Sequence, residues 1–418
     1  MDSVMKFYIS TLGCKANQAD SDSIASFISF VGGLVVKVAD EADIAIVNTC
    51  AVTSKASYQS RQMIRRLTKK GIRVIVIGCD VRYEKDAISV LEGVEAFENI
   101  DETFRYISSL VKEDKDRDKR PKGPSRARPF LKIQNGCDSF CSYCIVPYLR
   151  GAPSSLPPHE VIEKIKGFEE DGFYEVVLTG IHIGRYGRDM GLNLASLLRS
   201  ILCETNIPRI RLSSIEPDEV TDEILEIISS SGGRICPHLH IPLQSGSDKI
   251  LRLMNRRYTS QDFYSLIHRI TERLPSVSIG TDIITGFPGE TEKELEETYD
   301  MIAQLPISYL HVFTFSPRRG TLAERLPDQV PERIRKERTL LFRSLSRRKR
   351  IEYLSRRVGG IADVVFDLAK GDTSKRARKG VSEDYITVLV KDHGGPLENH
   401  ALVRLEEISG ECVLGSIL

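Results

Sequence analysis

Residues 136–151 read GCDSFCSYCIVPYLRG, and the architecture expected for the whole chain follows from this cysteine motif. Cys137, Cys141 and Cys144 have the spacing C-x3-C-x2-C, which keeps three thiolates on one short loop. Three cysteines can ligate three irons of a [4Fe–4S] cluster and leave the fourth iron open for a substrate or cofactor. The alternative is a structural zinc, but no nearby histidine or fourth cysteine completes its four ligands. Phe140 and Tyr143 are expected to shield the cluster from water.

After the motif, apolar strand-like segments alternate with amphipathic helical ones. Strands are predicted at 174–180, 209–215, 238–243, 277–286 and 308–316, and helices at about 157–171, 192–203, 218–230, 259–273 and 290–304. With a strand at the motif itself, this gives about six β/α units. The pattern predicts a partial, open barrel whose active site lies at the carboxyl ends of its strands.

Before the motif, three strand-like segments each end in a cysteine. They are KFYISTLGC (6–14), ADIAIVNTC (42–50) and RVIVIGC (73–79), with helical segments at 21–33 and 55–70. Alternating strands and helices predict an α/β domain with a parallel sheet, whose strands end at one common edge. Cys14, Cys50 and Cys79 are therefore expected to converge at that edge.

Two charged segments mark the other boundaries. Residues 112–128 carry eight basic and four acidic residues with Pro and Gly, which is typical of an exposed linker. Residues 333–357 form a basic helical segment with eleven basic and two acidic residues. Strand-like runs at 360–368, 384–390, 401–408 and 412–418, separated by Gly-rich turns, predict a small antiparallel β barrel. The expected organisation is 1–115, a linker at 116–129, the barrel with its basic helix at 130–357, and the small barrel at 358–418.

The composition excludes several classes of protein. The chain has 418 residues, 41% of them hydrophobic and 28% charged, with a formal net charge of +1, which is ordinary for a globular protein rather than a disordered, collagen-like or globally basic one. It has no run of 18 apolar residues, and its first residues do not resemble a signal peptide, so we expect no membrane span and a cytoplasmic location. Nine cysteines are too few for a disulfide scaffold of this length.

The motif followed by a partial barrel resembles the radical S-adenosylmethionine superfamily. Further strings make the chain similar to the methylthiotransferase family over nearly its whole length: TLGCKANQADSD (11–22), VNTCAVTSKA (47–56), VIGC (76–79), LQSGSDKILRLMNRRY (243–258), TDIITGFPGET (281–291) and HVFTFSPRRGTLA (311–323). The resemblance implies that Cys14, Cys50 and Cys79 hold a second, auxiliary [4Fe–4S] cluster. It also implies that residues 360–418 form a TRAM domain, a small RNA-binding barrel.

The resemblance further implies the chemistry. The open iron at the Cys137 motif would bind the amino and carboxylate groups of S-adenosylmethionine, whose reductive cleavage gives a 5′-deoxyadenosyl radical. The auxiliary cluster would carry the sulfur to be inserted, and a second S-adenosylmethionine would methylate it. Gly180, on a glycine-rich strand, is expected to meet the cofactor's amino group. Contacts are also expected from Glu216, Gln244, Asp282 and Arg318, although each of these four could instead cap an element or form a salt bridge.

Other cysteines and histidines are interpreted as structural. His238 and His240 alternate on one predicted strand and so face the same way. Cys203, Cys236 and Cys412 belong to no motif and are read as core or incidental thiols.

The expected partner is tRNA, bound through the basic helix at 333–357, the loop at 370–380 and the small barrel; the alternative for the helix is a solvated charged face. Within the family the chain looks most like the members that act on N6-threonylcarbamoyladenosine beside the anticodon, although Ala16 and Ala19 differ from the bulkier residues associated with that subgroup. The alternatives are isopentenyladenosine of tRNA and an aspartate of a ribosomal protein. A non-catalytic RNA-binding iron–sulfur protein is disfavoured by the full cysteine loop and barrel. The reaction needs a sulfur donor and an electron donor, and a monomer is expected.

Overall fold

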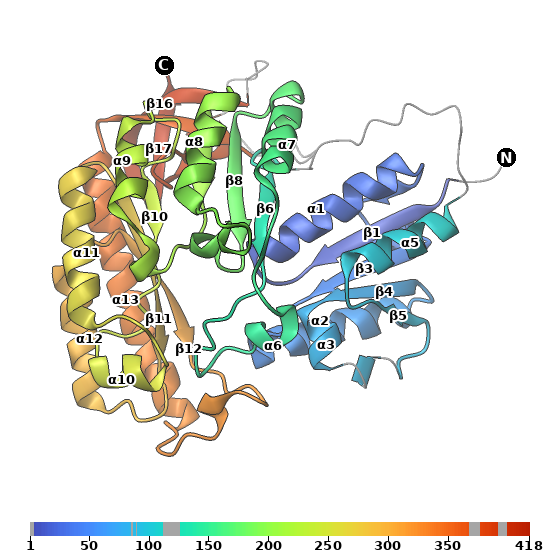
Figure 1. Ribbon diagram of the computed structural model, residues 1–418, viewed down its shortest axis with the longest axis horizontal. Coiled ribbons are helices and arrows are strands. Elements are labelled where there is room, and N and C mark those ends of the chain that lie inside the picture. Colours follow the sequence, from blue (N-terminus) through green and yellow to red (C-terminus); the bar gives the residue numbers. More distant parts are fainter. Residues whose placement is uncertain (1–3, 85–86, 89, 112–125, 368–376, 392–398) are drawn as a thin grey trace.

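The computed structural model describes residues 4–84, 87–88, 90–111, 126–367, 377–391 and 399–418 (Figure 1). Its N-terminal part is a parallel sheet in the order β2-β1-β3-β4-β5. The strands are β1 (Lys6–Thr11), β2 (Leu34–Val36), β3 (Ile44–Thr49), β4 (Arg73–Gly78) and β5 (Val94–Ala96). The helices are α1 (Lys15–Phe30), α2 (Ser54–Thr68), α3 (Cys79–Tyr83) and α5 (Ile100–Leu110). The parallel α/β prediction is confirmed, and the edge strands β2 and β5 were not predicted.

The central part is an open barrel of six parallel strands with helices on its outside (Figure 1). Its strands are β6 (Phe130–Asn135), β8 (Glu175–Gly180), β9 (Arg209–Leu212), β10 (His238–His240), β11 (Ser278–Thr285) and β12 (Tyr309–Thr314), with a short antiparallel β7 (Ser154–Ser155). Its helices are α6 (Val146–Arg150), α7 (Pro158–Glu170), α8 (Leu194–Glu204), α9 (Asp222–Ser230), α10 (Asp248–Leu253), α11 (Ser260–Arg273), α12 (Glu292–Gln304) and α13 (Glu332–Arg357). The predicted partial barrel is therefore confirmed.

The C-terminal part is a closed barrel in the order β13-β14-β15-β17-β16, as the TRAM prediction requires. The strands are β13 (Ile361–Phe366), β14 (Ala377–Ser382), β15 (Thr387–Lys391), β16 (His400–Ser409) and β17 (Cys412–Ile417). One prediction is wrong here, because residues 377–380 of the expected basic loop at 370–380 belong to β14. Residues 370–376 of that loop, and most of the predicted linker at 116–129, lie outside the described residues.

Helix α1 begins at Lys15, whereas the sequence predicted a helix only from residue 21. The first turns of α1 are polar, so they show no apolar stripe. In the structure this polar face packs on the barrel through charge pairs: Asp20 contacts Lys132 on β6, and Asp22 contacts Arg126 at 2.8 Å. Because ion pairs replace apolar contacts at this interface, hydrophobic periodicity could not locate the start of the helix.

The small C-terminal barrel packs against the amino ends of the central strands. Glu175, at the start of β8, is fully buried and accepts hydrogen bonds from Arg209 Nε at 2.6 Å and Arg211 Nε at 2.7 Å. The same two guanidinium groups donate to main-chain carbonyls of the small barrel, including Val381 and Ser382. Burial would raise the pKa of Glu175, but the two arginines lower it to about 2. This buried charge network therefore joins the two barrels.

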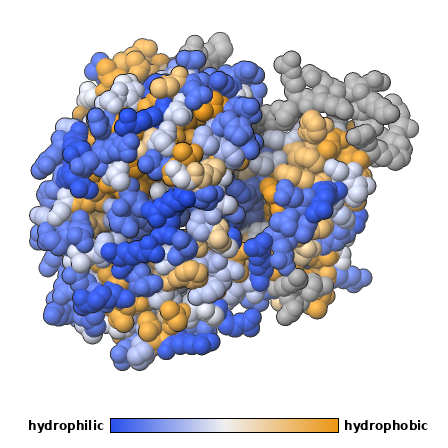
Figure 2. All heavy atoms as spheres, viewed as in Figure 1, coloured by the Kyte–Doolittle hydropathy of each residue, from blue (hydrophilic) through white to orange (hydrophobic). Residues whose placement is uncertain are grey.

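No helix in the described part of the chain combines the length and apolar character needed to cross a membrane. Figure 2 shows mostly hydrophilic residues on the face over the central barrel, with apolar residues interspersed. The long helix α13 is itself strongly basic, with 26 residues that include Arg347 and Arg348.

Candidate active site and its two cysteine centres

The Cys137 motif lies on the loop between β6 and α6, at the carboxyl edge of the barrel. Gly136 starts the loop with φ +74°, and a Cβ at this position would collide with the main-chain oxygen of Ala152, so only glycine fits. The loop is anchored to the end of α10 by Ser142, whose N–H donates to Met254 O at 3.0 Å and whose hydroxyl donates to Leu253 O at 2.6 Å. Neighbouring main chain thus sets the shape of the loop.

The two aromatic residues of the loop differ in exposure and in packing. Phe140 is 47% exposed and makes an edge contact with Tyr148 at 5.6 Å. Tyr143 instead packs edge-on against Phe287 at 6.3 Å between ring centroids. The shielding role predicted for both side chains stays a prediction.

Each of two loop sulfurs has a cationic or polar partner. Cys137 Sγ lies 3.4 Å from His182 Nδ1, and Arg256 Nη1 donates to Cys141 Sγ at 3.3 Å. Burial acts to raise the pKa of Cys137, but hydrogen bonds from His182 and Ser139 lower it. Burial raises the pKa of Cys144 to about 12, against the opposing effect of a main-chain hydrogen bond from Val146. Donors to sulfur stabilise the thiolate form, which is the form that ligates iron.

The second group of cysteines lies where three adjacent strands of the N-terminal sheet end. Cys14 follows β1, Cys50 follows β3, and Cys79 follows β4. Gly78 has φ +100°, and a Cβ there would collide with the main-chain oxygen of Thr49, so the close approach of the end of β4 to its neighbour β3 also requires glycine. Burial, together with the neighbouring Cys79 and Cys14 thiols, raises the pKa of Cys50 to about 11. The predicted convergence at one sheet edge is therefore present.

Arg150, at the end of α6, links the two cysteine groups. Its Nε donates to Cys79 Sγ at 3.3 Å, and its Nη1 donates to Asn135 Oδ1 at 3.0 Å on β6. Its Nη2 donates to Asn17 Oδ1 at 2.5 Å on α1. One guanidinium group therefore ties the helix that follows the loop cysteines to the N-terminal sheet edge.

Both groups of thiols fit a cluster better than a single zinc ion. Zinc binds thiolates at about 2.3 Å, so two sulfurs on one zinc lie at most about 4.6 Å apart. Among the described residues, neither set of three cysteines is drawn together closely enough to count as a ligand group for one metal ion. A [4Fe–4S] cluster takes one thiolate on each of several irons and so suits more widely spaced sulfurs. The donors Arg256 and Arg150 would also offset the negative charge of thiolate ligands.

A pocket opens beside the loop cysteines. It is lined by Ser139, Cys141, His182, Arg185, Glu216, Asp218, Asn255, Arg256, Arg257 and Tyr258. Glu216 is paired with Arg256, which also reaches Tyr258 OH at 2.9 Å. Burial raises the pKa of Glu216, although Arg256 acts against the shift. The arrangement places a carboxylate and a guanidinium, paired with each other, beside the loop sulfurs.

His182 also lines this pocket. Its Nε2 lies 2.7 Å from Glu219 Oε2, and its main-chain N–H donates to Gln134 Oε1 at 2.7 Å. Burial acts to lower the pKa of His182, but hydrogen bonds to Cys137 and Glu219 raise it to about 10. The imidazole is thereby fixed in orientation toward the loop.

Three other predicted contacts lie on the barrel wall. Gly180 ends β8, and a Cβ there would approach the Gln134 main-chain oxygen to 2.8 Å. Gln244 follows β10 with φ +70°, a costly conformation for a non-glycine residue, and its N–H donates to Asp282 O at 2.7 Å. Asp282 lies on β11, deeper in the barrel. Contact of each with the cofactor stays a prediction.

Arg318 lies away from this pocket. Its Nη2 donates to Ser57 Oγ at 3.0 Å on α2, and its guanidinium lies 4.2 Å from the ring centre of Tyr83 on α3. The side chain is buried between the barrel and the N-terminal part. In this structure Arg318 therefore joins two parts of the chain, and its contact with the cofactor is a prediction without geometric support.

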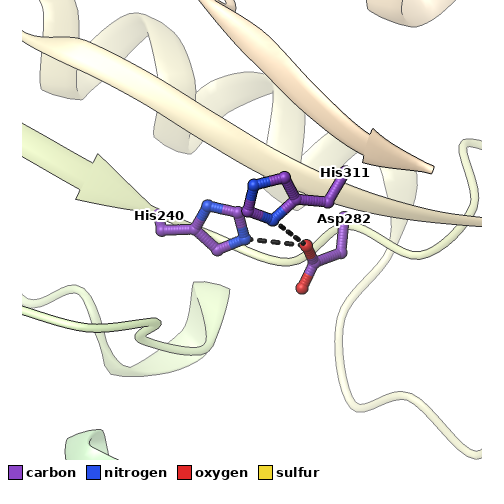
Figure 3. Close-up of side chains that lie close together, drawn as sticks. All are labelled: His240, Asp282 and His311. Carbon is purple, nitrogen blue, oxygen red and sulfur yellow. Dashed lines mark hydrogen bonds and ion pairs between the residues drawn. The ribbon is translucent and has the colours of Figure 1, made fainter. Parts of the chain in front are cut away.

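His240, Asp282 and His311 meet on adjacent strands inside the barrel (Figure 3). His240 Nε2 lies 2.8 Å and His311 Nδ1 lies 3.3 Å from the same oxygen, Asp282 Oδ1. His238 and His240 both contact Tyr309 OH, at 2.8 and 3.2 Å, so they face the same way as predicted. Burial would raise the pKa of Asp282, but His240 and His311 hold it well below its usual range. These are also ligand types for a divalent metal.

Sequence reasoning missed the residues that support the sulfurs. Arg256 and Arg150 stand in the family-like strings and His182 follows the strand predicted at 174–180, but none of the three carries a spacing signal of its own. Lys15 was also missed, and burial lowers its pKa to about 8. A basic residue directly beside a cysteine motif, such as Arg150, was the one signal available.

Of the three cysteines outside the motifs, Cys236 is buried and its pKa is raised to about 12 by burial. Cys203 is exposed and Cys412 is half-buried. Cys203 lies on α8 and Cys412 begins β17, so neither stands at a strand end that carries a cysteine centre.

Comparison with known proteins adds a family relationship. The radical SAM superfamily model matches residues 131–302, and that of an uncharacterized protein family, UPF0004, matches residues 6–97. The chain is 37% identical to the threonylcarbamoyladenosine tRNA methylthiotransferase of Aquifex aeolicus, over 85% of this chain and 91% of that protein. It is 35% identical to the Bacillus subtilis protein of the same name, over 91% and 89%.

The chain is also similar to a protein that is named for a different modified adenosine. The tRNA-2-methylthio-N(6)-dimethylallyladenosine synthase of Staphylococcus haemolyticus is 30% identical, over 96% of this chain and 79% of that protein. Among solved structures, a radical S-adenosylmethionine methyltransferase from Kitasatospora setae, with tryptophan and a cofactor analogue bound, has a TM-score of 0.55 at 14% identity, over 74% of this chain and 73% of that one. That likeness shows a shared fold.

Proposed function

Because the chain belongs to the radical S-adenosylmethionine tRNA methylthiotransferase family, we propose that it adds a methylthio group to C2 of N6-threonylcarbamoyladenosine next to the anticodon of tRNA. The observation that carries this choice is the 37% identity to a threonylcarbamoyladenosine enzyme over 85% of the chain. The same reaction on isopentenyladenosine is the second candidate, because a dimethylallyladenosine synthase of Syntrophus aciditrophicus is 32% identical over 90% of the chain.

Membership of the superfamily brings an iron–sulfur cluster and S-adenosylmethionine to the chain. We assign the radical-forming [4Fe–4S] cluster to Cys137, Cys141 and Cys144, and a second [4Fe–4S] cluster to the cysteines that end β1, β3 and β4: Cys14, Cys50 and Cys79. When bound, these groups supply the radical, the sulfur atom and the methyl group. The assignment of two clusters is supported by two separate cysteine groups, each with an arginine donating to one sulfur.

The chain's own residues position and shield the reaction. Arg256 holds Cys141 Sγ and the Glu216 carboxylate together, so the loop and the pocket wall keep a fixed distance. His182 likewise contacts both Cys137 Sγ and the Glu219 carboxylate. Glu216 is placed to accept hydrogen bonds from an amino or ribose hydroxyl group of the cofactor. Such preorganised contacts lower the cost of orienting a reactant.

The tRNA is proposed to bind along α13 and the small barrel. Exposed cations on α13 include Arg343, Arg347 and Arg356, and they would neutralise phosphates without reading sequence. Other basic residues of this helix form contacts within the protein: Arg338 pairs with Glu290 at 2.8 Å, and Lys349 donates to Ala303 O at 2.9 Å. Only part of the predicted basic helix is therefore available to RNA.

A sulfur donor and an electron donor must serve the reaction, since each turnover consumes a sulfur atom and reducing electrons. We propose that both are separate partners and that the enzyme works as a monomer in the cytoplasm. Size-exclusion chromatography measures the oligomeric state, and reconstitution with candidate donors measures the dependence on each partner.

The test is anaerobic reconstitution with iron, sulfide and dithionite, followed by assay on anticodon stem-loops that carry either modified adenosine. We expect 5′-deoxyadenosine and a C2-methylthio product with the threonylcarbamoyl substrate. Product on the isopentenyl substrate alone would overturn the substrate choice, and no 5′-deoxyadenosine on either would overturn the radical mechanism.

A further inference from the structure

The histidine pair around Asp282 lies on the wall of the barrel interior (Figure 3). His240, Asp282 and His311 come from β10, β11 and β12, and the register pairs Asp282 directly with His311. Each of these two residues stands three positions before the end of its strand, which is roughly 10 Å below the edge that carries the cysteine loop. If a base is bound at that edge, a substituent that extends roughly 10 Å into the barrel would reach them.

His311 differs from its neighbours because it is open to the interior. Its side chain is 51% exposed, whereas that of His240 is 7% exposed. His240 uses both ring nitrogens within the protein, on Asp282 and Tyr309. His311 uses Nδ1 on Asp282, and its Nε2 has no partner among the described residues. Its ring is held in place and keeps one nitrogen for a ligand.

One cation, Lys15, lies on the same side of the barrel and interacts with Asp282 through its charge. Lys15 Nζ lies 5.9 Å from the ring centre of Tyr385, which is 5.8 Å from Tyr309, which in turn is 5.3 Å from His311. Lys15 has no hydrogen-bond or ion-pair partner in the described part of the chain, although Asp282 and Glu175 act on it through their charges. By contrast, the nearby Arg211 is already paired with Glu175. Lys15 is therefore a cation without an ion-pair partner among the described residues.

We propose that His311, oriented by Asp282 and assisted by Lys15, forms a subsite that binds the carboxylate of the threonylcarbamoyl substituent. An imidazolium whose Nδ1 donates to one carboxylate can donate Nε2–H to a second one. The isopentenyl substituent has no polar atom to use such a donor, so the subsite would discriminate between the two modified bases. The inference rests on the proposed function and names the group of the substrate that the site reads.

A metal ion is the competing occupant of the same three side chains. Zinc or ferrous iron would take one nitrogen from each imidazole and one carboxylate oxygen. In the structure both imidazole nitrogens instead approach one oxygen at 2.8 and 3.3 Å, as two donors sharing an acceptor do. Ligands of one metal ion lie at similar separations, so the experiment below distinguishes the two occupants.

The experiment compares two anticodon stem-loops that differ by one group: the threonylcarbamoyl substrate as its free acid and as its primary amide. Reconstituted wild-type enzyme is expected to prefer the acid by about 10- to 100-fold in kcat/KM, the range for one hydrogen bond to a charged group. The His311→Phe variant should act on the acid and on the amide with the same kcat/KM, equal to that of the wild-type enzyme on the amide. Anaerobic fluorescence anisotropy should show the same loss of preference in affinity.

The matched control is His159→Phe on the exposed face of α7, which should keep the wild-type preference. Lys15→Met should lower the preference as well, with iron content measured to exclude loss of the adjacent cluster. An unchanged preference in His311→Phe would overturn the subsite while leaving the proposed function intact. Zinc or iron with nitrogen ligands by X-ray absorption, absent from His311→Phe, would also overturn it. Wild-type activity only on the isopentenyl substrate would instead overturn the proposed function.

Discussion

The two cysteine centres are built in opposite ways. Cys137, Cys141 and Cys144 lie within eight residues of one loop, whereas Cys14, Cys50 and Cys79 come from three strand ends spread over 66 residues. Both centres nevertheless share two devices: a glycine of positive φ directly before a cysteine, and an arginine that donates to one sulfur at 3.3 Å. The comparison separates the local chemistry that the two cysteine groups share from the way in which the fold supplies it.

Their surroundings differ in a way that suits different tasks. The loop centre borders a pocket with a charged wall, which includes Glu216 and Arg256. At the sheet centre, Cys50 and Cys79 are buried while Cys14 is exposed, so access is from one side. Arg150 connects the two centres, and its contacts place the sheet edge next to the helix that follows the loop.

The largest expected effect comes from removing one cysteine at each centre. Cys137→Ala should abolish 5′-deoxyadenosine formation, because that thiolate cannot be replaced on the loop. Cys79→Ala should keep 5′-deoxyadenosine formation but stop sulfur insertion. Both are read by chromatography of the nucleoside products and by iron content. Equal loss of 5′-deoxyadenosine in the two variants would contradict the division of labour.

The same contrast explains what the sequence could predict. The loop centre is visible as a spacing, and the sheet centre is visible because three apolar strands each end in a cysteine. The supporting groups were not visible, because His182, Arg256 and Arg150 reach their sulfurs only through tertiary packing. The polar start of α1 was missed for a related reason, since Asp20 and Asp22 pair with the barrel.

The strand β14 shows another limit of sequence reasoning. Its segment ARKGVS begins with charged residues that resemble a loop. The pairing of Gly380 with Phe366 and Val388 places it in the closed barrel instead. Charged side chains can point to solvent from a strand of a small barrel, so composition alone misassigned the segment.

The next largest effect is expected from the glycines that precede the cysteines. Gly78→Ala should lower the unfolding free energy by about 2–4 kcal/mol, because positive φ costs about 1 kcal/mol or more and the new Cβ meets Thr49 O. The variant should also lose iron from the sheet centre. Thermal unfolding and iron analysis measure both effects.

Gly71→Ala is the matched control. Gly71 has φ +74° but nothing within 4 Å of a Cβ, so it tests the backbone cost alone, about 1 kcal/mol. The loop centre offers a similar pair, because a Cβ would collide at Gly136 but has free space at Gly151. Gly136→Ala should therefore reduce cofactor cleavage, and Gly151→Ala is its control. If Gly71→Ala and Gly78→Ala behave alike, the steric role of Gly78 is disproved.

A smaller effect is expected when each arginine is replaced by lysine, which keeps the charge and loses the fork of donors. Arg256→Lys should slow 5′-deoxyadenosine formation by about tenfold, the equivalent of one charged hydrogen bond. Arg150→Lys should leave that rate unchanged and reduce methylthio product instead. Single-turnover assays and electron paramagnetic resonance of the reduced clusters distinguish the two. Slower cofactor cleavage in Arg150→Lys would mean that the centres are not independent.

The smallest effect on either centre is expected from surface charge far from both. Arg343→Gln on α13 removes an exposed cation that forms no ion pair within the described part of the chain. If Arg343 neutralises one phosphate, the variant should show a slope of log affinity against log salt that is shallower by about 0.7–0.9. The iron content and the 5′-deoxyadenosine rate without tRNA should match wild type, since the residue touches neither centre. Affinity measured at salt concentrations from about 50 to 200 mM tests this directly. An unchanged slope would remove Arg343 from the tRNA path, whereas a changed cluster signal would show that α13 communicates with the cysteine centres.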